Sequence, residues 1–440
     1  MGYAPDNRRE DYDGDLHVIL VGGSGRGKTT RYWVPWIISD KGSILAETDV
    51  AAELSMLCGN ARAAMSEVWI DNPHGIMQSH IGHLPHGCNN PAATLIPGSK
   101  KFGIKSMKLA AGHVVIDPHA TQKYWQHTAQ TGLKAVIMAK AADGEDASLV
   151  AVAEEVHRAD FLESIANTCE KFSKRQGLWA REIVSTLSRY TTAQEQSVKS
   201  ILEVVEQMRT DTDFELDEGV AMNLTRDDFR TRDARRKVMS IFRVLGIDVI
   251  EVLGKYFRLH LTSDIAELMD PDIEGDKDVT FYCDEYGIAA HGGLESMSVL
   301  FGAGRKGQLQ ACISVLDLDQ LQKIHHDWST LLASAGAVIF MCPITDPITA
   351  DFVSRKCGET EVYTSSLNSD RSGRNRGPSE GFGRASRRLI TPAELAALDE
   401  DDVIVFTEFT KGRPMKLKSK PYWEVPELRD RVGKNKYYER

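Results

Sequence analysis

The stretch that decides the fold reads His17-Val18-Ile19-Leu20-Val21-Gly22-Gly23-Ser24-Gly25-Arg26-Gly27-Lys28-Thr29. Its first five residues are mostly apolar and β-branched, which predicts a buried strand. The remainder fits the phosphate-binding loop pattern G-x-x-x-x-G-K-[ST], and Thr29–Trp33 can open a helix. Glycines allow backbone N–H groups to surround phosphate oxygens, and the helix N-terminus adds a positive dipole end. The sequence therefore predicts a nucleoside-triphosphate site.

Nine residues of this loop are expected to contact the nucleotide. They are Gly22, Gly23, Ser24, Gly25, Arg26, Gly27, Lys28, Thr29 and Thr30. Lys28 is expected to reach the β- and γ-phosphates, and the hydroxyl of Thr29 to bind Mg²⁺. ATP and Mg²⁺ are therefore the expected cofactors.

A second run, Val279-Thr280-Phe281-Tyr282-Cys283-Asp284-Glu285, predicts a strand that ends in two carboxylates. Such a strand delivers its first acid to the metal and its second to the attacking water. We expect Asp284 to hold Mg²⁺ and Glu285 to activate water. The pattern is weak alone and gains its meaning from the phosphate-binding loop.

The composition is that of a globular protein, with 42% hydrophobic and 26% charged residues. The net charge of −10 argues against a uniformly basic nucleic-acid binder, although a local basic groove stays possible. Seven scattered cysteines without a CxxC pair favour a reduced, cytoplasmic compartment. No apolar stretch reaches the roughly 18 residues of a membrane span.

The order of predicted elements is strand–helix alternation, then helices, then alternation again. Residues 42–46, 67–71, 310–316, 337–341 and 403–406 read as further strands, and residues 72–113 read as loop. Helical periodicity runs from about residue 121 to residue 208, and residues 211–275 are ambiguous. Residues 364–388 are rich in Ser, Gly and Arg and read as a mobile loop.

These patterns predict an α/β fold of the P-loop NTPase (RecA-like) type, with a doubly wound, mostly parallel sheet and an inserted all-α domain. The expected ranges are 1–115 for the first part of the nucleotide-binding domain, 116–250 for the all-α insert, and 251–440 for the second part.

The chain resembles the cytoplasmic part of conjugative, or type IV secretion, coupling proteins of the TraG type. Besides the phosphate-binding loop, the matching segments in chain order are Val34-Pro35-Trp36-Ile37, Asn90-Pro91, Asp284-Glu285-Tyr286-Gly287, Gly304-Arg305-Lys306, Gln320-Leu321, Ile344-Thr345-Asp346-Pro347-Ile348-Thr349-Ala350 and Arg388-Leu389-Ile390-Thr391-Pro392-Ala393-Glu394-Leu395. Each later segment alone is weak evidence for the resemblance, whereas the order and spacing of all the segments together are specific to the family.

The resemblance implies a hexameric ATPase that translocates DNA, with a relaxase-bound single strand or an effector protein as cargo and secretion-channel components as partners. It places Arg305 where the family carries an arginine that reaches across the subunit boundary, which makes Lys28, Glu285 and Arg305 the expected catalytic residues. It also implies a location at the inner face of the cell membrane, with the family's membrane-spanning segment either missing or supplied by a separate anchor.

The sequence departs from the family in its acidic and sensor positions. Glu47-Thr48-Asp49-Val50-Ala51 stands where the family usually has Asp-Pro-Lys-Gly-Glu, which places negative charge near the phosphates. Leu316, followed by Asp317, stands where the family usually has a glutamine that senses the γ-phosphate, and an apolar side chain cannot orient water. A core strand expected just before residue 275 is not evident. These departures affect hydrolysis more than binding.

Three polar clusters are weighed against ordinary surface loops. Arg371, Arg374, Arg376, Arg384, Arg387 and Arg388 could contact phosphate backbone, as could Lys100, Lys101, Lys105 and Lys108. The loop from His74 to Cys88 carries several histidines without a familiar zinc spacing, so a polar loop is favoured over a metal site. His325 and His326 are expected to end a helix, where positive charge is favourable.

Three functions stay open at this point. The first is an ATP-driven translocase that couples DNA or nucleoprotein to a secretion channel. The second is an ATP-binding docking platform of the same apparatus with little or no hydrolysis. The third is a double-stranded DNA segregation or packaging motor.

Overall fold

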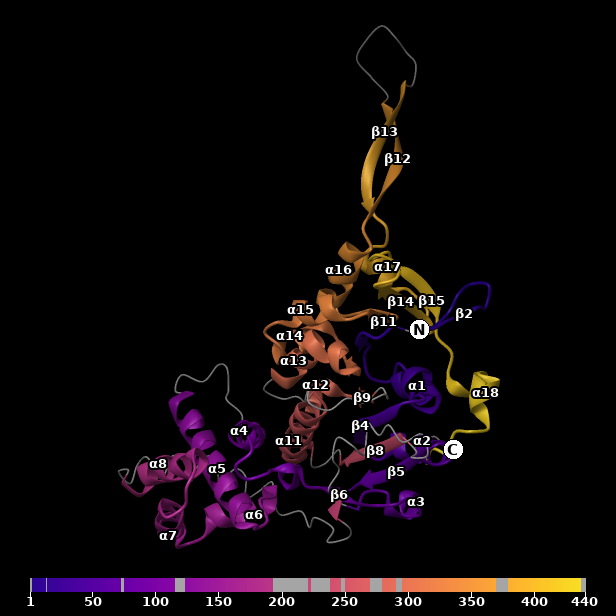
Figure 1. Cartoon of the computed structure of the whole chain (residues 1–440). Helices are drawn as coiled ribbons and strands as arrows, with labels where there is room; N and C mark the ends of the chain where they lie inside the picture. The colour runs from indigo at the N-terminus through magenta and orange to yellow at the C-terminus, as the bar shows by residue number, and fades with distance from the viewer. Residues whose placement is uncertain are drawn as a thin grey trace.

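The structure is a computed structural model of the whole chain. It describes residues 2–12, 14–72, 75–114, 123–192, 221–222, 238–246, 250–269, 279–289, 295–368 and 379–436. Figure 1 presents a lobe built on a large sheet, a helical lobe beside it, and a two-stranded arm that projects from the sheet lobe.

An 11-stranded sheet organises the first lobe, in the order β2-β1-β15-β14-β11-β3-β10-β9-β4-β8-β5. The seven parallel strands of this sheet are β11 (Ala337–Met341), β3 (Val18–Val21), β10 (Leu309–Val315), β9 (Val279–Cys283), β4 (Ser43–Val50), β8 (Val238–Leu245) and β5 (Ser66–Asp71). The antiparallel strands at the other edge are β14 (Asp402–Thr407), β15 (Met415–Lys418), β1 (Gly2–Tyr3) and β2 (Arg9–Glu10). The predicted α/β fold with a doubly wound, mostly parallel sheet is confirmed.

Alternate side chains of the central strand enter different cores. Ile19 and Val21 of β3 pack in one buried apolar cluster, and Val18 and Leu20 pack in the other. Because both faces of β3 are buried, its sequence is continuously apolar and does not alternate. The strand therefore ends at a fixed, rigid position, where the phosphate-binding loop begins.

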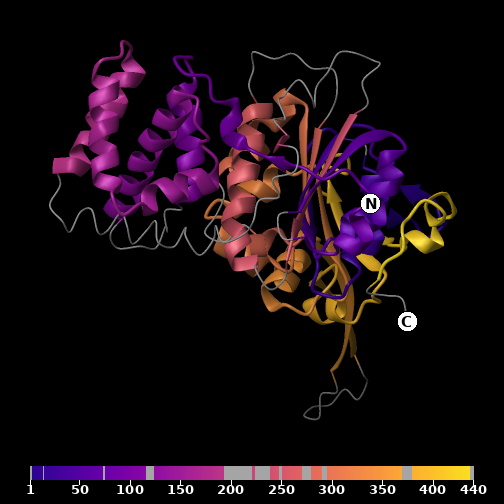
Figure 2. The same cartoon turned by 90° about the horizontal axis from the view of Figure 1, so that it is seen from below.

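Helices cover both faces of the sheet (Figure 2). The first face carries α1 (Val34–Ser39), α2 (Glu53–Ala63), α3 (Gln78–Ile81) and α18 (Pro426–Arg429). The second face carries α11 (Ile250–Leu268), α13 (Glu295–Ala303), α14 (Leu318–Ile324), α15 (Trp328–Ser334) and α16 (Pro347–Lys356). The shorter helical elements are α12 (Tyr286–Ala289), α17 (Pro392–Ala396) and the single turns η1 (Thr29–Trp33), η2 (Pro91–Thr94), η3 (Gly304–Gly307) and η4 (Tyr422–Glu424).

The helical lobe lies to one side of the sheet in both ribbon views. Its helices are α4 (Phe102–His113), α5 (Lys123–Asp143), α6 (Leu149–His157), α7 (Phe161–Ser173) and α8 (Leu178–Thr192). α4 packs on both α5 and α11 and so connects the two lobes. The periodicity predicted for residues 194–208 lies outside the described residues, and the domain ranges ending at residues 115 and 250 stay predictions.

Three predictions about single segments are wrong. Residues 72–113 are not all loop, because they contain the 12-residue helix α4. Residues 364–388 are not simply a loop, because β12 (Glu359–Asn368) pairs with β13 (Ser379–Arg388) as an antiparallel ribbon. The core strand thought to be absent before residue 275 is β8, which lies between β4 and β5 and precedes α11.

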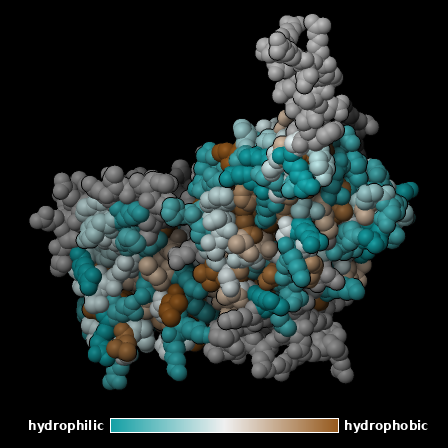
Figure 3. Space-filling model, turned by 90° about the horizontal axis from the view of Figure 1, so that it is seen from above, coloured by the Kyte–Doolittle hydropathy of each residue, from teal (hydrophilic) through white to brown (hydrophobic). Residues whose placement is uncertain are grey.

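Two minor strands, β6 (Cys88–Asn89) and β7 (Ala221–Met222), pair with each other in a separate two-stranded sheet beside β5. The surface in Figure 3 is largely hydrophilic, with hydrophobic residues in small scattered groups. None of the described helices combines the length and apolar character that crossing a bilayer requires.

Candidate functional site

The phosphate-binding loop emerges from β3 at the carboxyl edge of the parallel strands. The Gly22 N–H donates to the Val315 carbonyl at 3.0 Å, so the loop starts against the end of β10. Gly25 and Gly27 have φ angles of 75° and 78°, a left-handed conformation that glycine adopts without strain. The Arg31 N–H and the Thr30 hydroxyl both donate to the Gly27 carbonyl, which joins the loop to η1 and α1.

Lys28 lies at the end of this loop, with only 6% of its surface exposed. Its Nζ lies 3.1 Å from the Gly22 carbonyl, to which it donates, and 3.1 Å from Glu285 Oε1. The loop lysine and the second carboxylate of the β9 run, which are 257 positions apart in the sequence, are thus in direct contact.

Asp284 follows the last residue of β9 and is buried, with 8% exposure. Its Oδ1 accepts hydrogen bonds from the Ser314 hydroxyl at 2.8 Å and from the Glu285 N–H at 2.9 Å. Burial raises the pKa of Asp284, the Glu285 carboxylate raises it further, and Lys28 opposes both effects. A buried carboxylate of this kind is favoured in its ionised form by a cation beside it.

Thr29 and Glu53 complete an oxygen-rich group beside Asp284. The Thr29 hydroxyl donates to Glu53 Oε2 at 3.4 Å, and Glu53 opens α2. Burial raises the pKa of Glu53, and the Asp284 carboxylate is near enough to raise it further. Hydroxyl and carboxylate oxygens are the ligands that Mg²⁺ prefers, so the side chains present fit this metal.

Sequence reasoning missed Glu53 because it aligned the family pattern two residues too early. Asp49 and Glu53 have the spacing of the first and last acids in Asp-Pro-Lys-Gly-Glu, with Ala51 at the lysine position. Ala51 and Ala52 have φ angles of 56° and 61°, the backbone form for which glycine is usual. The spacing of Asp49 and Glu53 is the sequence signal that points to Glu53.

The expectation that Glu47 and Asp49 place negative charge at the phosphates is therefore revised. Asp49 accepts the N–H groups of Leu54 and Ser55 at 2.6 and 2.8 Å and so caps α2. Glu47 is fully buried and lies 3.1 Å from the Arg243 guanidinium of β8. Both carboxylates are occupied within the fold, which removes the argument that they repel a nucleotide.

Leu316 lies beside the phosphate-binding loop, as the sequence predicted for the sensor position. It lines a cavity of about 360 Å³ together with Gly22, Ser24 and Asp317. The Leu316 N–H donates to the side-chain carbonyl of Gln320 at 2.8 Å, one helical turn further along the chain. That Gln320 side chain packs so closely on Gly287 that any Cβ there would collide with it.

Glu285 has a φ angle of 48°, which costs a non-glycine residue about 1–3 kcal/mol and often marks a functional site. Arg305 lies elsewhere. It is exposed in η3, which precedes β10, whereas the phosphate-binding loop lies beyond the end of β10. β10 has seven residues and spans about 23 Å. The structure therefore brings together Lys28, Thr29, Asp284 and Glu285 but not Arg305.

The arginines of the β12–β13 ribbon are paired wherever the structure describes their contacts. Arg384 lies 3.5 Å from Glu361, Arg388 lies 2.7 Å from Asp351, and Arg387 pairs with Glu394. Arg371, Arg374 and Arg376 lie outside the described residues. In the lysine cluster before and within α4, Lys105 pairs with Glu267 at 2.5 Å. Contact of either cluster with DNA stays a prediction.

Two described histidines of the His74–Cys88 loop make hydrogen bonds within the fold. His83 Nε2 lies 2.9 Å from Asn60 Oδ1, and His86 Nε2 lies 3.2 Å from the Ile81 carbonyl. His74 and the Cys88 side chain lie outside the described residues. His325 ends α14 as predicted, but burial lowers its pKa to about 4, so it is neutral at pH 7 and carries no favourable charge there.

Comparisons with known proteins identify the family of this chain. A family model described as type IV secretory system conjugative DNA transfer matches residues 5–440. The chain is 24% identical over 214 residues to the conjugal transfer protein TraG of Agrobacterium fabrum (strain C58 / ATCC 33970), covering 48% of this chain and 32% of that protein. It is 26% identical over 171 residues to a probable TraG of Sinorhizobium fredii (strain NBRC 101917 / NGR234), covering 38% of this chain and 26% of that protein. The chain thus spans about a third or less of these curated relatives.

Solved structures share the fold at low sequence identity. An unbound bacterial conjugative coupling protein, TrwBdeltaN70, has a TM-score of 0.66 at 16% identity, covering 92% of this chain and 85% of its own. Plasmid coupling protein TrwB in complex with ADP and Mg²⁺ has a TM-score of 0.66 at 15% identity, covering 92% and 86%. At these identities the likeness supports the fold alone.

Proposed function

This chain belongs to the type IV secretory system conjugative DNA transfer family, and from that premise we propose that it is an ATP-driven coupling protein. It moves DNA, with or without a bound relaxase, or an effector protein toward a secretion channel. The observation that carries the proposal is the contact of Lys28 with Glu285 beside the buried Asp284, at the carboxyl edge of a parallel sheet.

Positioning accounts for most of the proposed chemistry. The loop N–H groups and Lys28 bind the β- and γ-phosphates, while Thr29 and Asp284, with Glu53 nearby, hold the metal ion. Bound Mg²⁺ offsets charge on the phosphate oxygens. Glu285 leaves Lys28 for the attacking water once phosphate takes its place, and accepts the water's proton. A solved relative, TrwB, was crystallised with ADP and Mg²⁺ and with an ATP analogue, which supports ATP and Mg²⁺ as the ligands.

The location of Arg305 favours a ring. One protomer offers Arg305 at the edge of its sheet opposite its own phosphate-binding loop, so the guanidinium cannot reach that loop within the chain. A head-to-tail assembly brings it to a neighbour's site, where an arginine stabilises transition-state charge. We propose a hexamer that acts at the inner face of the cell membrane, with the helical lobe as an inserted domain.

A second function is favoured by one residue. Leu316 lies beside the loop, where a polar side chain could sense phosphate. If turnover is absent, the protein is a nucleotide-gated docking platform of the same apparatus. ATP hydrolysis measured with Mg²⁺, with and without single- and double-stranded DNA, separates the two. Hydrolysis raised by DNA supports the translocase, whereas tight ATP binding without hydrolysis supports the platform.

A further inference from the structure

A buried N–H group without a partner lies beside the proposed metal site. Trp33 ends η1, directly after the phosphate-binding loop, and none of its surface is exposed. Its indole N–H has no hydrogen-bond partner among the residues that the structure describes. An unsatisfied buried donor costs about 1–3 kcal/mol, which a phenylalanine at the same position would avoid. Packing of the ring therefore does not account for the N–H.

Two spacings aim the Trp33 ring at Asp284. Thr29 and Trp33 are four positions apart, about one turn of η1, so their side chains lie on the same face of it. Tyr282 and Asp284 are two positions apart at the end of β9 and point to one side of the sheet. The Trp33 and Tyr282 rings meet edge to face, with their centroids 5.9 Å apart. Trp33 thus lies on the side of β9 from which Asp284 projects.

The Asp284 carboxylate has one oxygen to spare. Its Oδ1 accepts from the Ser314 hydroxyl and the Glu285 N–H, and the Thr48 hydroxyl donates to its backbone carbonyl. Oδ2 accepts no hydrogen bond within the described part of the chain. Burial raises the pKa of Asp284 most, and the nearby Trp33 N–H acts in the opposite direction as a donor. An unpartnered donor and an open acceptor therefore lie close together without a completed hydrogen bond.

We propose that Trp33 is a positioning residue for the metal ion, whose indole N–H orients the Asp284 carboxylate toward bound Mg²⁺. The proposal rests on the proposed function, because it concerns the same metal group. A carboxylate accepts a charge-assisted hydrogen bond, which is stronger than one between neutral groups. Removing the partner that orients a metal ligand lowers metal affinity by roughly 10–100-fold. The role thus predicts a loss of metal affinity that packing of the ring does not.

Trp36 offers a matched comparison for Trp33. It lies on α1, is partly exposed, and packs edge to face on Trp33 with the ring centroids 5.6 Å apart. Trp36→Phe therefore removes an indole N–H from the same aromatic cluster but leaves in place the donor that faces Asp284. A general effect of losing a tryptophan here would appear in both variants.

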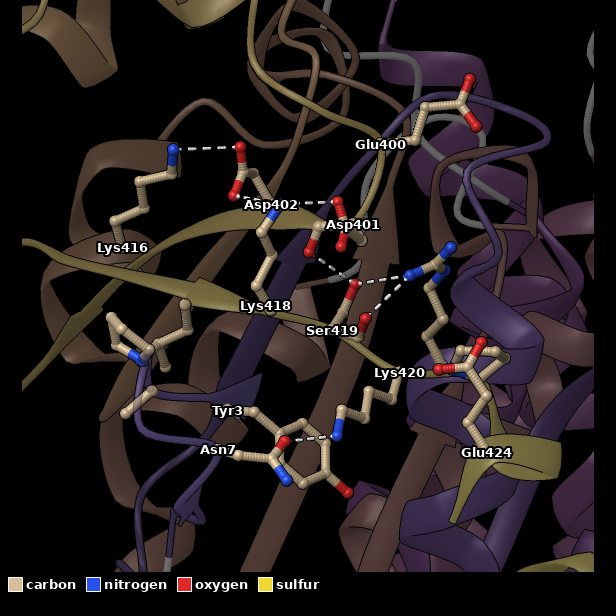
Figure 4. A pocket seen from close by; sticks show the side chains of 15 residues that line it. Tyr3, Asn7, Glu400, Asp401, Asp402, Lys416, Lys418, Ser419, Lys420 and Glu424 are labelled. Carbon is tan, nitrogen blue, oxygen red and sulfur yellow. Dashed lines mark hydrogen bonds and ion pairs between the residues drawn. The ribbon is translucent and has the colours of Figure 1, made fainter.

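A second acidic group, at the antiparallel edge of the sheet, does not compete for the ion. Asp399, Asp401 and Asp402 lie close enough together to share a metal. However, Lys418 Nζ lies 3.2, 2.8 and 3.0 Å from their three carboxylates (Figure 4). A lysine already supplies the positive charge there, so a change in Mg²⁺ binding is assigned to the Asp284 group.

The test measures how much Mg²⁺ strengthens ATP binding by the full chain. ATP is titrated calorimetrically in Mg²⁺ and again in EDTA, and the ratio of the two affinities is called the metal gain. Trp33→Phe removes the N–H and keeps an aromatic ring, with Trp36→Phe as the control. Benzothienylalanine at position 33 keeps the shape of the indole and replaces its N–H with sulfur, which protects the test if phenylalanine disturbs folding. Circular dichroism verifies that each protein is folded.

We expect both changes at position 33 to lower the metal gain about tenfold or more, with ATP affinity in EDTA unchanged. Trp36→Phe should match the wild type in both titrations. A wild-type metal gain in the folded proteins changed at position 33 would overturn the proposal. Equal loss of ATP affinity in Mg²⁺ and in EDTA would also overturn it, because that result indicates a structural role. A wild-type protein without any metal gain would instead refute the proposed metal site itself.

Discussion

Lys28 and Glu285 form an ion pair, with Lys28 Nζ 3.1 Å from Glu285 Oε1. The lysine ends the phosphate-binding loop and the glutamate follows the metal-binding strand, so the two halves of the proposed site meet in this contact. In the proposed mechanism, a γ-phosphate inserted here competes with Glu285 for Lys28 and releases the carboxylate toward water. We propose that the pair links nucleotide binding to readiness for hydrolysis.

Substituting Lys28→Ala should abolish triphosphate binding, with a loss of at least about a hundredfold in affinity, because the lysine is the proposed ligand of the β- and γ-phosphates. Isothermal titration with MgATP measures this loss. Lys174→Ala, an exposed lysine of α7, is the control. Wild-type affinity in Lys28→Ala would refute the site assignment.

Substituting Glu285→Gln should preserve ATP binding and lower turnover by roughly 10²–10⁴-fold, the usual contribution of a general base. The amide retains the shape of the side chain but cannot accept the proton. Binding and steady-state hydrolysis are measured on the same preparation. Equal turnover in the variant and the wild type would show that Glu285 is not the base.

Substituting Arg305→Ala should leave ATP affinity unchanged and lower turnover by about 10³-fold or more, as expected for an arginine donated by a neighbour. Mixing this variant with Lys28→Ala tests directly whether Arg305 acts on the site of a neighbouring subunit. In mixed rings, an intact loop of one variant meets the intact Arg305 of the other, so activity should partly return. No recovery in rings verified to be mixed would argue against action in trans.

Substituting Leu316→Gln should raise hydrolysis if the apolar residue limits phosphate sensing, because an amide can orient water. Turnover per protomer is compared at saturating ATP, with Leu316→Met as the apolar control of similar volume. If the glutamine variant hydrolyses ATP no faster than the wild type, the explanation of slow turnover through Leu316 fails.

Stability should fall as the pH drops from about 6.5 to about 4. Burial lowers the pKa of His325 from its ordinary value of 6.5 to about 4, and the Tyr286 hydroxyl lies 2.6 Å from its Nε2. Below pH 6.5 the unfolded chain binds a proton that the folded chain does not, so unfolding becomes easier. The free energy of unfolding of His325→Gln, measured by denaturant titration, should depend less steeply on pH than that of the wild type. An unchanged pH slope would indicate that His325 is not neutral in the fold.

The site and the parallel strands could be predicted because their signals are local. A continuous apolar run marks each central strand, and Lys28, Thr29, Asp284 and Glu285 follow such runs directly. β8 escaped prediction because Arg243 interrupts its apolar run, and only the fold reveals the carboxylates that neutralise this arginine.

Other parts of the fold and of the site depend on tertiary contacts that no local sequence pattern predicts. α4 contains Gly103 and Gly112, which lower helix propensity, and packing on α5 and α11 stabilises it. β12 and β13 consist largely of Ser, Gly and charged residues, and their strand form comes from pairing with each other. Glu53 reaches Thr29 because α2 begins beside the loop, a tertiary relation.

Steady-state ATP hydrolysis, measured with and without single-stranded DNA at several protein concentrations, tests the central claim most directly. A DNA-driven ring that completes each site with a neighbour's Arg305 predicts turnover that rises with DNA and more than linearly with protein. Tight ATP binding with no hydrolysis at any protein or DNA concentration would contradict the motor and leave a nucleotide-gated platform.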